Sequence, residues 1–173
     1  STTNLWALEF AGGVASDPIR FRVNGGSTIG GAVTSTGYTA NVWHHVCAVE
    51  TSNVSRAVFI DGGGKGTSTL NRTPGSIDTI SLGVRETSTP DEFFAGDLAE
   101  AAIWNEALSD ANVALLAKGV SPLLVRPSAL VFYAPVIGRT SPEIELRGGR
   151  RLTVTGAVVR NHRRIVYPSQ AAS

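Results

Sequence analysis

The sequence lacks most features that mark disulfide-rich and membrane-embedded proteins. Its 173 residues include one cysteine, Cys47, so no internal disulfide can form. No apolar run approaches the roughly 20 residues that a membrane-spanning helix needs. The chain begins at Ser1, without methionine and without the basic stretch typical of a signal peptide. We therefore expect no membrane insertion, and either a processed start or further sequence upstream.

Lysine is absent from the last part of the chain, and the charge there changes sign. Residues 1–125 carry 7 Lys/Arg against 12 Asp/Glu, a net −5, and residues 126–173 carry 8 Arg against 2 Glu, a net +6. The split predicts a neutral-to-acidic body with a basic C-terminal segment. That segment could bind nucleic acid, an acidic protein, or the acidic body of a neighbouring copy. It has no dense basic run and contains strand-like stretches, so we favour protein–protein docking. The arginines expected to contact the partner are Arg147, Arg150, Arg151, Arg160, Arg163 and Arg164.

Short alternating stretches, separated by turns rich in the 19 glycines and 8 prolines, predict many strands. Ile19, Phe21 and Val23 should face inward, and a longer strand over 93–104 should turn Leu98, Ala101 (or Glu100) and Ile103 inward. The expected strands are LWALEF (5–10), IRFRV (19–23), IGGAVTS (29–35), VWHHVCAVE (42–50), RAVFIDG (56–62), TISLGV (79–84), FFAGDLAEAAIW (93–104), ALVFYAPVIG (129–138), RLTVTGAVV (151–159) and RRIVYP (163–168).

One helix is expected over residues 110–118. Ser109 is a good N-cap, Leu108 and Val113 occupy hydrophobic-staple positions, and Gly119 stands where a C-terminal cap belongs. The helix follows strands and does not alternate with them. The chain is therefore predicted to be all-β with one short helix, folded as a sandwich, jelly roll or barrel.

The stretch VWHHVCAVE invites a metal or nucleophile interpretation. Successive side chains on a strand point to opposite faces, so His44 and His45 should not coordinate the same metal ion. His45 and Cys47 share a face, but two ligands are half of a zinc site, and His162 lies far off in the basic tail. We expect Cys47 to be a small apolar filler of a buried strand.

No catalytic machinery is evident, so we expect no enzyme. Asp97 and Glu100 are the nearest carboxylate pair, but their spacing of three puts them on opposite faces of a regular strand. In GGGKGTS (62–68), Lys65 is followed by glycine, which does not fit a phosphate-binding loop, and a flexible hairpin tip is expected. Sugar rings stack on exposed aromatic faces, and the candidates for that role are Trp6, Tyr38, Trp43, Trp104 and Tyr133.

Four pieces, WHHVCAVE, RAVFIDG, ISLGV and FFAGDLAEAAIWNEALSDANVALLAKG, occur in an order that resembles the laminin G-like, concanavalin A-like lectin/glucanase jelly roll. The resemblance covers about residues 40–119. It implies a two-sheet jelly-roll domain over 1–125, followed by an Arg-rich segment over 126–173 that contains strands. The residues that fall on the family pattern are Phe94, Gly96, Trp104, Asn105, Ala107, Leu108 and Ser109.

The resemblance also bears on individual residues. It implies core positions for Trp43 and Trp104, and a structural calcium with Asp97 as a candidate ligand, although the acid is displaced from the usual place. The family's first strands are hard to find. Residues 120–135, a partner chain or an unlisted segment would then complete the sheet, because bare sheet edges are hazardous.

The C-terminal stretch 127–168 resembles segments that follow such domains in bacteriophage and prophage proteins. It implies a non-enzymatic virion protein, a capsid decoration or tail-associated component. Such a protein would dock onto other virion proteins, form a homo-oligomer and contact host glycans. The alternative is a carbohydrate-binding module of a secreted or cell-surface protein, and a glycoside hydrolase is less favoured. Nucleic acid and membrane partners are not expected.

Overall fold

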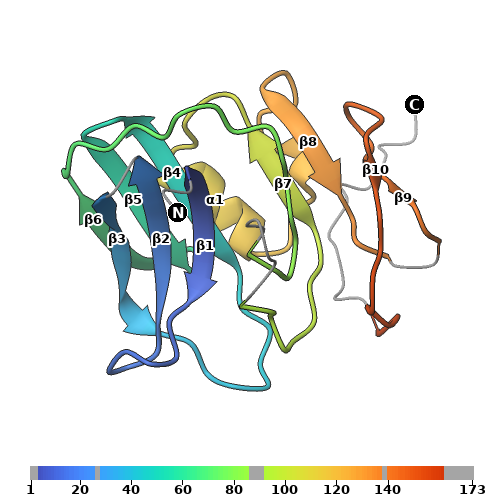
Figure 1. Cartoon of the computed structure of the whole chain (residues 1–173), viewed down its shortest axis with the longest axis horizontal. Helices are drawn as coiled ribbons and strands as arrows, with labels where there is room; N and C mark the ends of the chain where they lie inside the picture. The colour runs from blue at the N-terminus through green and yellow to red at the C-terminus, as the bar shows by residue number, and fades with distance from the viewer. Residues whose placement is uncertain (1–3, 26–27, 86–91, 138–139, 162–173) are drawn as a thin grey trace, which may run out of the picture. The chain divides into compact units, whose positions relative to one another are not determined.

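The computed structural model describes residues 4–25, 28–85, 92–137 and 140–161 (Figure 1). The chain divides into two compact units, Ser1–Ala95 and Gly96–Ser173. Compactness alone does not fix where a family domain ends, so the division into 1–125 and 126–173 stays a prediction. No helix among the described residues is long and apolar enough to cross a membrane.

In the first unit, the described residues form two antiparallel sheets of three strands each. One sheet has the order β1-β2-β3, formed by β1 (Leu5–Phe10), β2 (Pro18–Gly25) and β3 (Thr28–Gly37). The other has the order β4-β5-β6, formed by β4 (Val46–Ser52), β5 (Ser55–Ile60) and β6 (Gly63–Ser68). Every pairing is between strands consecutive in the chain, so each sheet is a simple meander.

The core of this unit lies between β2–β3 and β5. The predicted inward set of β2, Ile19, Phe21 and Val23, is buried and packs with Val58 and Ile60 of β5. Arg20 and Arg22 of the same strand lie on the opposite face, where both form ion pairs with Glu9. Burying each large apolar side chain contributes about 1.5–3 kcal/mol, so the two-residue period of IRFRV decides which face becomes the core.

The glycine-rich stretch after β5 is itself a strand, so the predicted flexible hairpin tip is wrong. Asp61 (φ 53°) and Gly62 (φ 75°) form the turn, as a two-residue hairpin of this hand requires, and β6 pairs with β5 beyond it. A Cβ atom at Gly66 would lie 1.7 Å from the carbonyl oxygen of Val33 on β3. The glycines of β6 therefore let two backbones approach more closely than side chains would allow.

The second unit holds two small sheets and the helix. Antiparallel β7 (Ala101–Trp104) pairs with β8 (Leu130–Ala134), and β9 (Glu143–Ile144) pairs with β10 (Arg151–Leu152). Helix α1 (Asp110–Ala117) and the 3₁₀ turn η1 (Pro122–Leu124) connect β7 to β8.

The helix prediction is confirmed in detail. The Ser109 hydroxyl accepts a hydrogen bond from the Asn112 backbone N–H, and the Asn112 side chain caps the Ser109 N–H in return. Gly119 adopts the left-handed conformation, φ 86°, just after the last turn. The predicted staple residues Leu108 and Val113 are both buried.

Several predicted strands are shorter than expected or absent. TISLGV forms no strand, and of FFAGDLAEAAIW only the last four residues do. Glu100 has φ 58°, which interrupts the alternation, and the predicted inward residues Leu98 and Ile103 are 39% and 42% exposed. In VWHHVCAVE the strand begins at Val46, and RLTVTGAVV pairs through its first two residues alone. RRIVYP lies outside the described residues.

The fold class nevertheless stands as predicted. The described residues form antiparallel sheets with a single α-helix, consistent with a concanavalin A-like sandwich.

Candidate functional site

Three connections meet at one end of the first unit, which we call the loop end. They are the β1–β2 turn (11–17), the β3–β4 loop (38–45) and the β5–β6 turn (61–62), and the first two lie at the bottom of Figure 1. Loops supported by a sheet scaffold are where proteins most often place binding residues, because their sequence can vary without disturbing the core.

His44 holds the β3–β4 loop against the β5–β6 turn. Its Nδ1 lies 2.7 Å from Oδ2 of Asp61, and the other oxygen of that carboxylate accepts the His45 backbone N–H at 2.9 Å. On its far side, His44 Nε2 lies 2.9 Å from the Thr39 backbone nitrogen and 3.1 Å from the Thr39 carbonyl oxygen. With Nδ1 protonated, His44 donates to Asp61 and accepts from Thr39, so a single ring fixes both ends of the loop.

The histidines and the cysteine therefore have separate positions. His45 contributes a backbone contact to the turn, whereas Cys47 lies in β4 with its side chain buried. Burial raises the pKa of the Cys47 thiol to about 12, so the sulfur stays protonated at neutral pH. Among the described residues, no three His, Cys, Asp or Glu side chains are grouped closely enough to hold a metal ion.

Trp43 stands exposed on the braced loop, and its predicted core position is wrong. The side chain is 36% exposed and its neighbour Val42 is 58% exposed. The error follows from the strand beginning at Val46, which leaves Trp43 in the loop and free of the sheet alternation. Asn41 adopts a left-handed conformation, φ 61°, at the bend that precedes the two apolar residues.

The other four aromatic candidates divide into buried and exposed. Tyr38 is half-buried and packs edge-on against Phe10, with ring centroids 4.9 Å apart. Trp104 donates its indole N–H to the Val125 carbonyl at 2.7 Å, in keeping with its predicted core position, and Tyr133 is buried. Trp6 is 54% exposed. Trp43 and Trp6 are therefore the candidates with an open ring surface.

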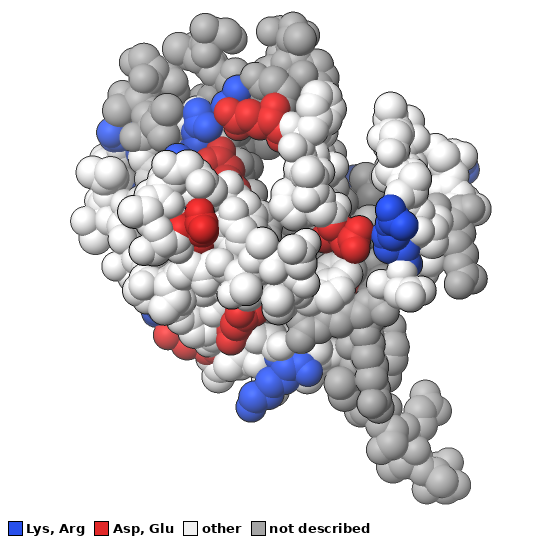
Figure 2. Space-filling model, turned by 90° about the horizontal axis from the view of Figure 1, so that it is seen from below, with Lys and Arg blue, Asp and Glu red and all other residues white. Residues whose placement is uncertain are grey.

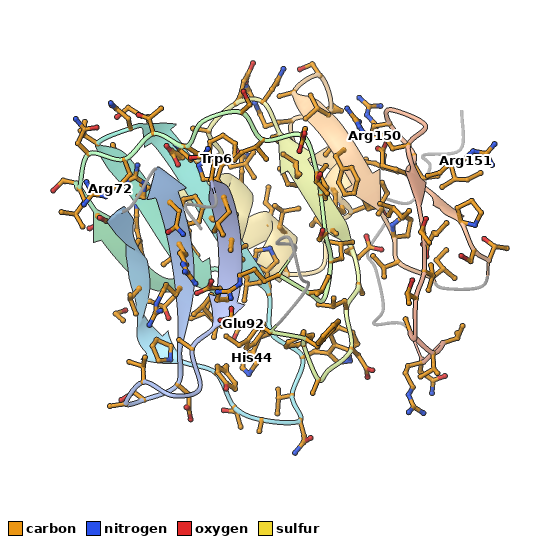
Figure 3. The ribbon with its side chains drawn as sticks, in the orientation of Figure 1. Trp6, His44, Arg72, Glu92, Arg150 and Arg151 are labelled. Carbon is orange, nitrogen blue, oxygen red and sulfur yellow. The ribbon has the colours of Figure 1, made fainter. Side chains whose placement is uncertain are left out.

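Trp6 lies on an edge strand and faces the side of the sheet that forms the core. It pairs in register with Val23, which is buried, and Leu8 on the same face of β1 is 42% exposed. Both side chains therefore lie on the core-facing side of the sheet, but outside the part of that side that the second sheet covers. Figure 3 shows Trp6 well away from His44, which marks the loop end.

The acidic candidates lie in different environments. Asp97 is exposed in the segment before β7, and its predicted role as a calcium ligand stays a prediction. Glu100 accepts a hydrogen bond from the Tyr133 hydroxyl at 2.7 Å, which ties the start of β7 to β8. This contact gives Glu100 a structural role.

The predicted partner-binding arginines also differ from one another. Arg147 donates to the Leu130 carbonyl at 3.3 Å, and Arg150 to the Val131 carbonyl at 3.4 Å, so both contact β8 of their own unit. Arg151 and Arg160 are exposed, and Figure 3 shows Arg151 pointing away from β8. Arg163 and Arg164 lie outside the described residues. Partner binding by this set stays a prediction.

Glu145 is a buried carboxylate that sequence patterns did not reveal. Oε1 accepts the backbone N–H groups of Tyr133 and Arg147 at 2.8 and 2.6 Å, and Oε2 accepts that of Gly148 at 2.5 Å. Burial alone raises the pKa of Glu145, but these hydrogen bonds and one from the Arg150 backbone outweigh it, and the net pKa is lowered. No local motif signals this, because the amides come from two separate segments.

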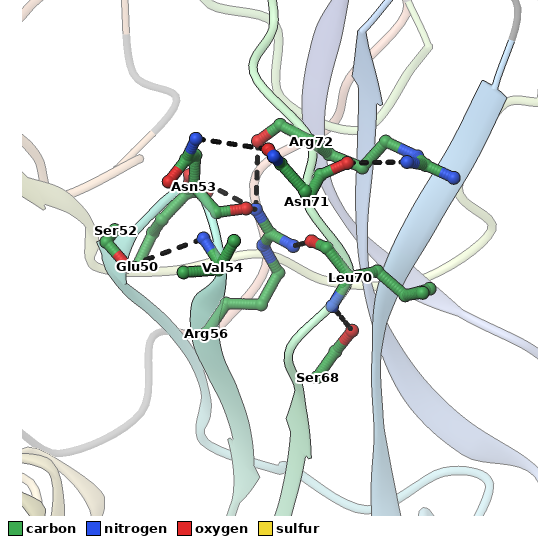
Figure 4. Close-up of polar contacts among 9 residues, drawn as sticks. All are labelled: Glu50, Ser52, Asn53, Val54, Arg56, Ser68, Leu70, Asn71 and Arg72. Carbon is green, nitrogen blue, oxygen red and sulfur yellow. Dashed lines mark hydrogen bonds and ion pairs between the residues drawn. The ribbon is translucent and has the colours of Figure 1, made fainter.

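Arg56 is a second buried charged residue that was missed. Figure 4 shows its guanidinium between the β4–β5 turn and the segment after β6. It donates to the carbonyl oxygens of Leu70, Asn53 and Arg72 at 2.5, 2.8 and 3.0 Å, and lies 3.4 Å from a carboxylate oxygen of Glu50. The side chain is fully buried, so this end of the unit is a closed structural junction.

The charged side chains of the described residues occupy a small part of the surface on the loop side. Viewed from below, Figure 2 shows uncharged residues over much of the described surface, with some acidic and basic side chains lying next to one another.

Two stacked antiparallel sheets with an exposed tryptophan on a connecting loop define a β-sandwich of the kind that binding modules use. The chain belongs to the concanavalin A-like lectin/glucanases superfamily, because a laminin G family model with that description matches residues 1–114. No curated protein and no solved structure matches the chain significantly. The family description names both lectins and glucanases, and gives no context of virus or host.

Proposed function

We propose that the protein is a non-catalytic carbohydrate-recognition module, and that a sugar ring stacks on Trp43 at the loop end. The observation that carries the proposal is a tryptophan exposed on a loop that His44 and Asp61 brace. A loop that is already ordered loses little conformational entropy when a ligand binds. The modest contact energy of one sugar ring is therefore not offset by the cost of ordering the loop.

The chemistry around Trp43 supports this ligand class. The indole offers a large apolar face, and an aromatic side chain of this size loses few rotamers on binding. Asp61 keeps about half of its side chain exposed (54%) beside the loop, and Asn41 is exposed at its tip. The carboxylate can accept hydrogen bonds from sugar hydroxyls, and the amide can both accept and donate them.

A hydrolytic role receives less support. A retaining glycosidase needs two carboxyl groups about 5–5.5 Å apart, one of them free to act as nucleophile. At the loop end, both oxygens of Asp61 already bind His44 and the His45 backbone. In the second unit, Glu100 is hydrogen-bonded to Tyr133. These commitments favour binding without bond cleavage.

A glycan array probed with the full chain tests the proposal. We expect binding to one or more glycans by the wild type, and at least a tenfold loss in Trp43→Ala, because such a change removes roughly 1.5–3 kcal/mol of contact. Trp6→Ala is the matched control, since it removes an indole that is also exposed (54%, against 36% for Trp43) but lies on strand β1, away from the loop end. Binding that survives Trp43→Ala, or that disappears in Trp6→Ala instead, would contradict the assignment.

We also propose that a structural calcium ion binds this module through Asp97. Calcium prefers six to eight oxygen ligands, so Asp97 would need backbone carbonyls beside it. The same array run with calcium and with a chelator, on wild type and Asp97→Asn, tests this. An identical glycan profile and an identical unfolding temperature in all four samples would rule the site out.

We further propose a virion location, with the protein attached to capsid or tail proteins as a homo-oligomer. The support is the resemblance of residues 127–168 to segments of bacteriophage proteins and the net charge of +6 over 126–173. Mass spectrometry of purified particles from a host strain that carries the gene tests this. Detection in culture supernatant or at the cell surface without particles would favour the alternative, a module of an extracellular protein.

A further inference from the structure

The hairpin formed by β9 and β10 buries acidic side chains and exposes apolar ones. Along residues 143–146 the side chains alternate between buried and exposed, but the buried ones are Glu143 and Glu145, and the exposed ones are Ile144 and Leu146, each 55% exposed. A strand at a protein surface ordinarily buries its apolar residues and leaves its carboxylates in water. In this hairpin the carboxylates are buried and the apolar residues are exposed to water.

The inversion is stable because the unit supplies hydrogen bonds to both carboxylates. Glu143 accepts the Ile137 backbone N–H at 2.7 Å, and Glu145 accepts those of Tyr133, Arg147 and Gly148. Leu146 also donates its backbone N–H to the Tyr133 carbonyl at 2.8 Å. These contacts fix the hairpin to β8 in one register, so Ile144 and Leu146 cannot turn inward by a one-residue shift.

The exposed face also carries positive charge. Arg151 is the cross-strand neighbour of Ile144 and is exposed, so the two side chains share the outer face of the hairpin. We call this face the outer hairpin face, defined by Ile144, Leu146 and Arg151. Arg147 and Arg150, in contrast, contact carbonyl groups of β8.

We infer that the outer hairpin face is a self-association surface that docks onto the acidic body of a second copy of this chain. Two apolar side chains beside an arginine form a small interface centre of the kind that proteins bind, with the charge giving orientation. The charge balance identifies the occupant. Residues 126–173 carry +6 and residues 1–125 carry −5, so the two regions of neighbouring copies neutralise each other. Asp17, Asp78 and Asp97 are exposed acids of that body.

The contact joins different surfaces of the two copies, so it is heterologous and builds rings or chains rather than a closed pair. This inference rests on the hairpin and the charge distribution, and is independent of glycan binding at Trp43. For the homo-oligomer proposed above, it specifies that the outer hairpin face of one copy contacts the acidic body of the next.

Sedimentation velocity of the full chain at concentrations up to about 100 µM tests the proposed self-association. The dissociation constant that it yields is converted to a free energy by the standard relation. We expect concentration-dependent assembly that weakens as salt rises from about 50 mM to about 500 mM, because screening reduces the charge attraction. The double variant Ile144→Ser/Leu146→Ser and the single variant Arg151→Glu should each weaken assembly roughly tenfold or more.

Leu115→Ser is the matched control, because Leu115 is 44% exposed on α1, away from the hairpin sequence, and should leave assembly unchanged. Circular dichroism checks that each variant is folded. If the double variant does not fold, Arg151→Glu alone tests the hairpin surface. A wild type that stays monomeric at all concentrations, or assembly equal to wild type in both hairpin variants, overturns the inference. Trp43→Ala should assemble normally, which separates this result from that of the glycan array.

Discussion

At the scale of single residues, the most informative positions are two buried charges. Arg56 and Glu145 have side chains with no exposed area, and each is surrounded by backbone groups of the opposite polarity. Both connect segments that are distant in the sequence. A buried charge is tolerated only when hydrogen bonds replace its lost hydration, so these contacts are conditions for folding and cannot be removed one by one without cost.

Arg56→Lys is expected to lower the free energy of unfolding by roughly 2–4 kcal/mol, because an ammonium group cannot reach the carbonyls that the planar guanidinium joins. Urea unfolding followed by tryptophan fluorescence measures the change. Arg20→Lys is the control, since Arg20 forms a 3.9 Å ion pair at the surface and should change stability by about 0.5 kcal/mol or less. Equal effects of the two substitutions would refute the special role of Arg56.

Glu145 makes stability depend on pH. Its folded pKa is lowered below the ordinary value of 4.5, so its contribution is present above that value and is lost as the pH falls through the folded pKa. We expect Glu145→Gln to be roughly 2–4 kcal/mol less stable than wild type at pH 7. The difference should shrink as the pH is lowered below about 4.5.

Thermal unfolding of both proteins between neutral and acidic pH checks this expectation. Glu106→Gln serves as control, since Glu106 is half-exposed in a surface ion pair with Arg126. A constant difference between wild type and Glu145→Gln at every pH would mean that the carboxylate charge plays no part.

At the scale of elements, the contact between β6 and β3 depends on glycine. A side chain at Gly66 would collide with the backbone of Val33, whereas a Cβ at Gly63 meets nothing within 4 Å. We expect Gly66→Ala to lose roughly 2–4 kcal/mol of stability or to fail to fold, and Gly63→Ala to change stability by less than about 1 kcal/mol. Chemical denaturation of the pair measures both. A tolerated Gly66→Ala would show that the two strands can separate without loss.

Elements also differ in how far their sequences predict them. The alternation of IRFRV and the cap residues around Ser109 act locally, so both predictions are confirmed. β6 was missed because a run of glycines is also typical of a turn. The expected strand over 93–104 was overestimated because Glu100 adopts a backbone conformation that non-glycine residues seldom take, which no alternation pattern reveals.

At the scale of the whole molecule, the fold class could be predicted and the site could be predicted only in part. Family-like pieces in the right order indicated a two-sheet sandwich, and the family match confirms it. Trp43 was named among the aromatic candidates but was expected in the core. Arg56 and Glu145 were not found, because their partners lie in segments brought together by the fold.

The whole chain also separates its surfaces by chemistry. The loop end of the first unit presents an open indole, while the outer hairpin face of the second unit presents apolar residues beside arginine. The proposed sugar site and the proposed assembly surface therefore use different residues, and we expect substitutions to disable either one alone.

The junction at Arg56 has a consequence for anyone who would graft new specificities onto this scaffold. Because one guanidinium binds carbonyls from both the 51–55 and 69–73 connections, randomising either connection would unsettle the other. The loop end imposes a milder constraint: residues 40–43 could be varied as long as Thr39, His44 and Asp61 are kept and position 41 holds a residue, such as asparagine or glycine, that tolerates positive φ.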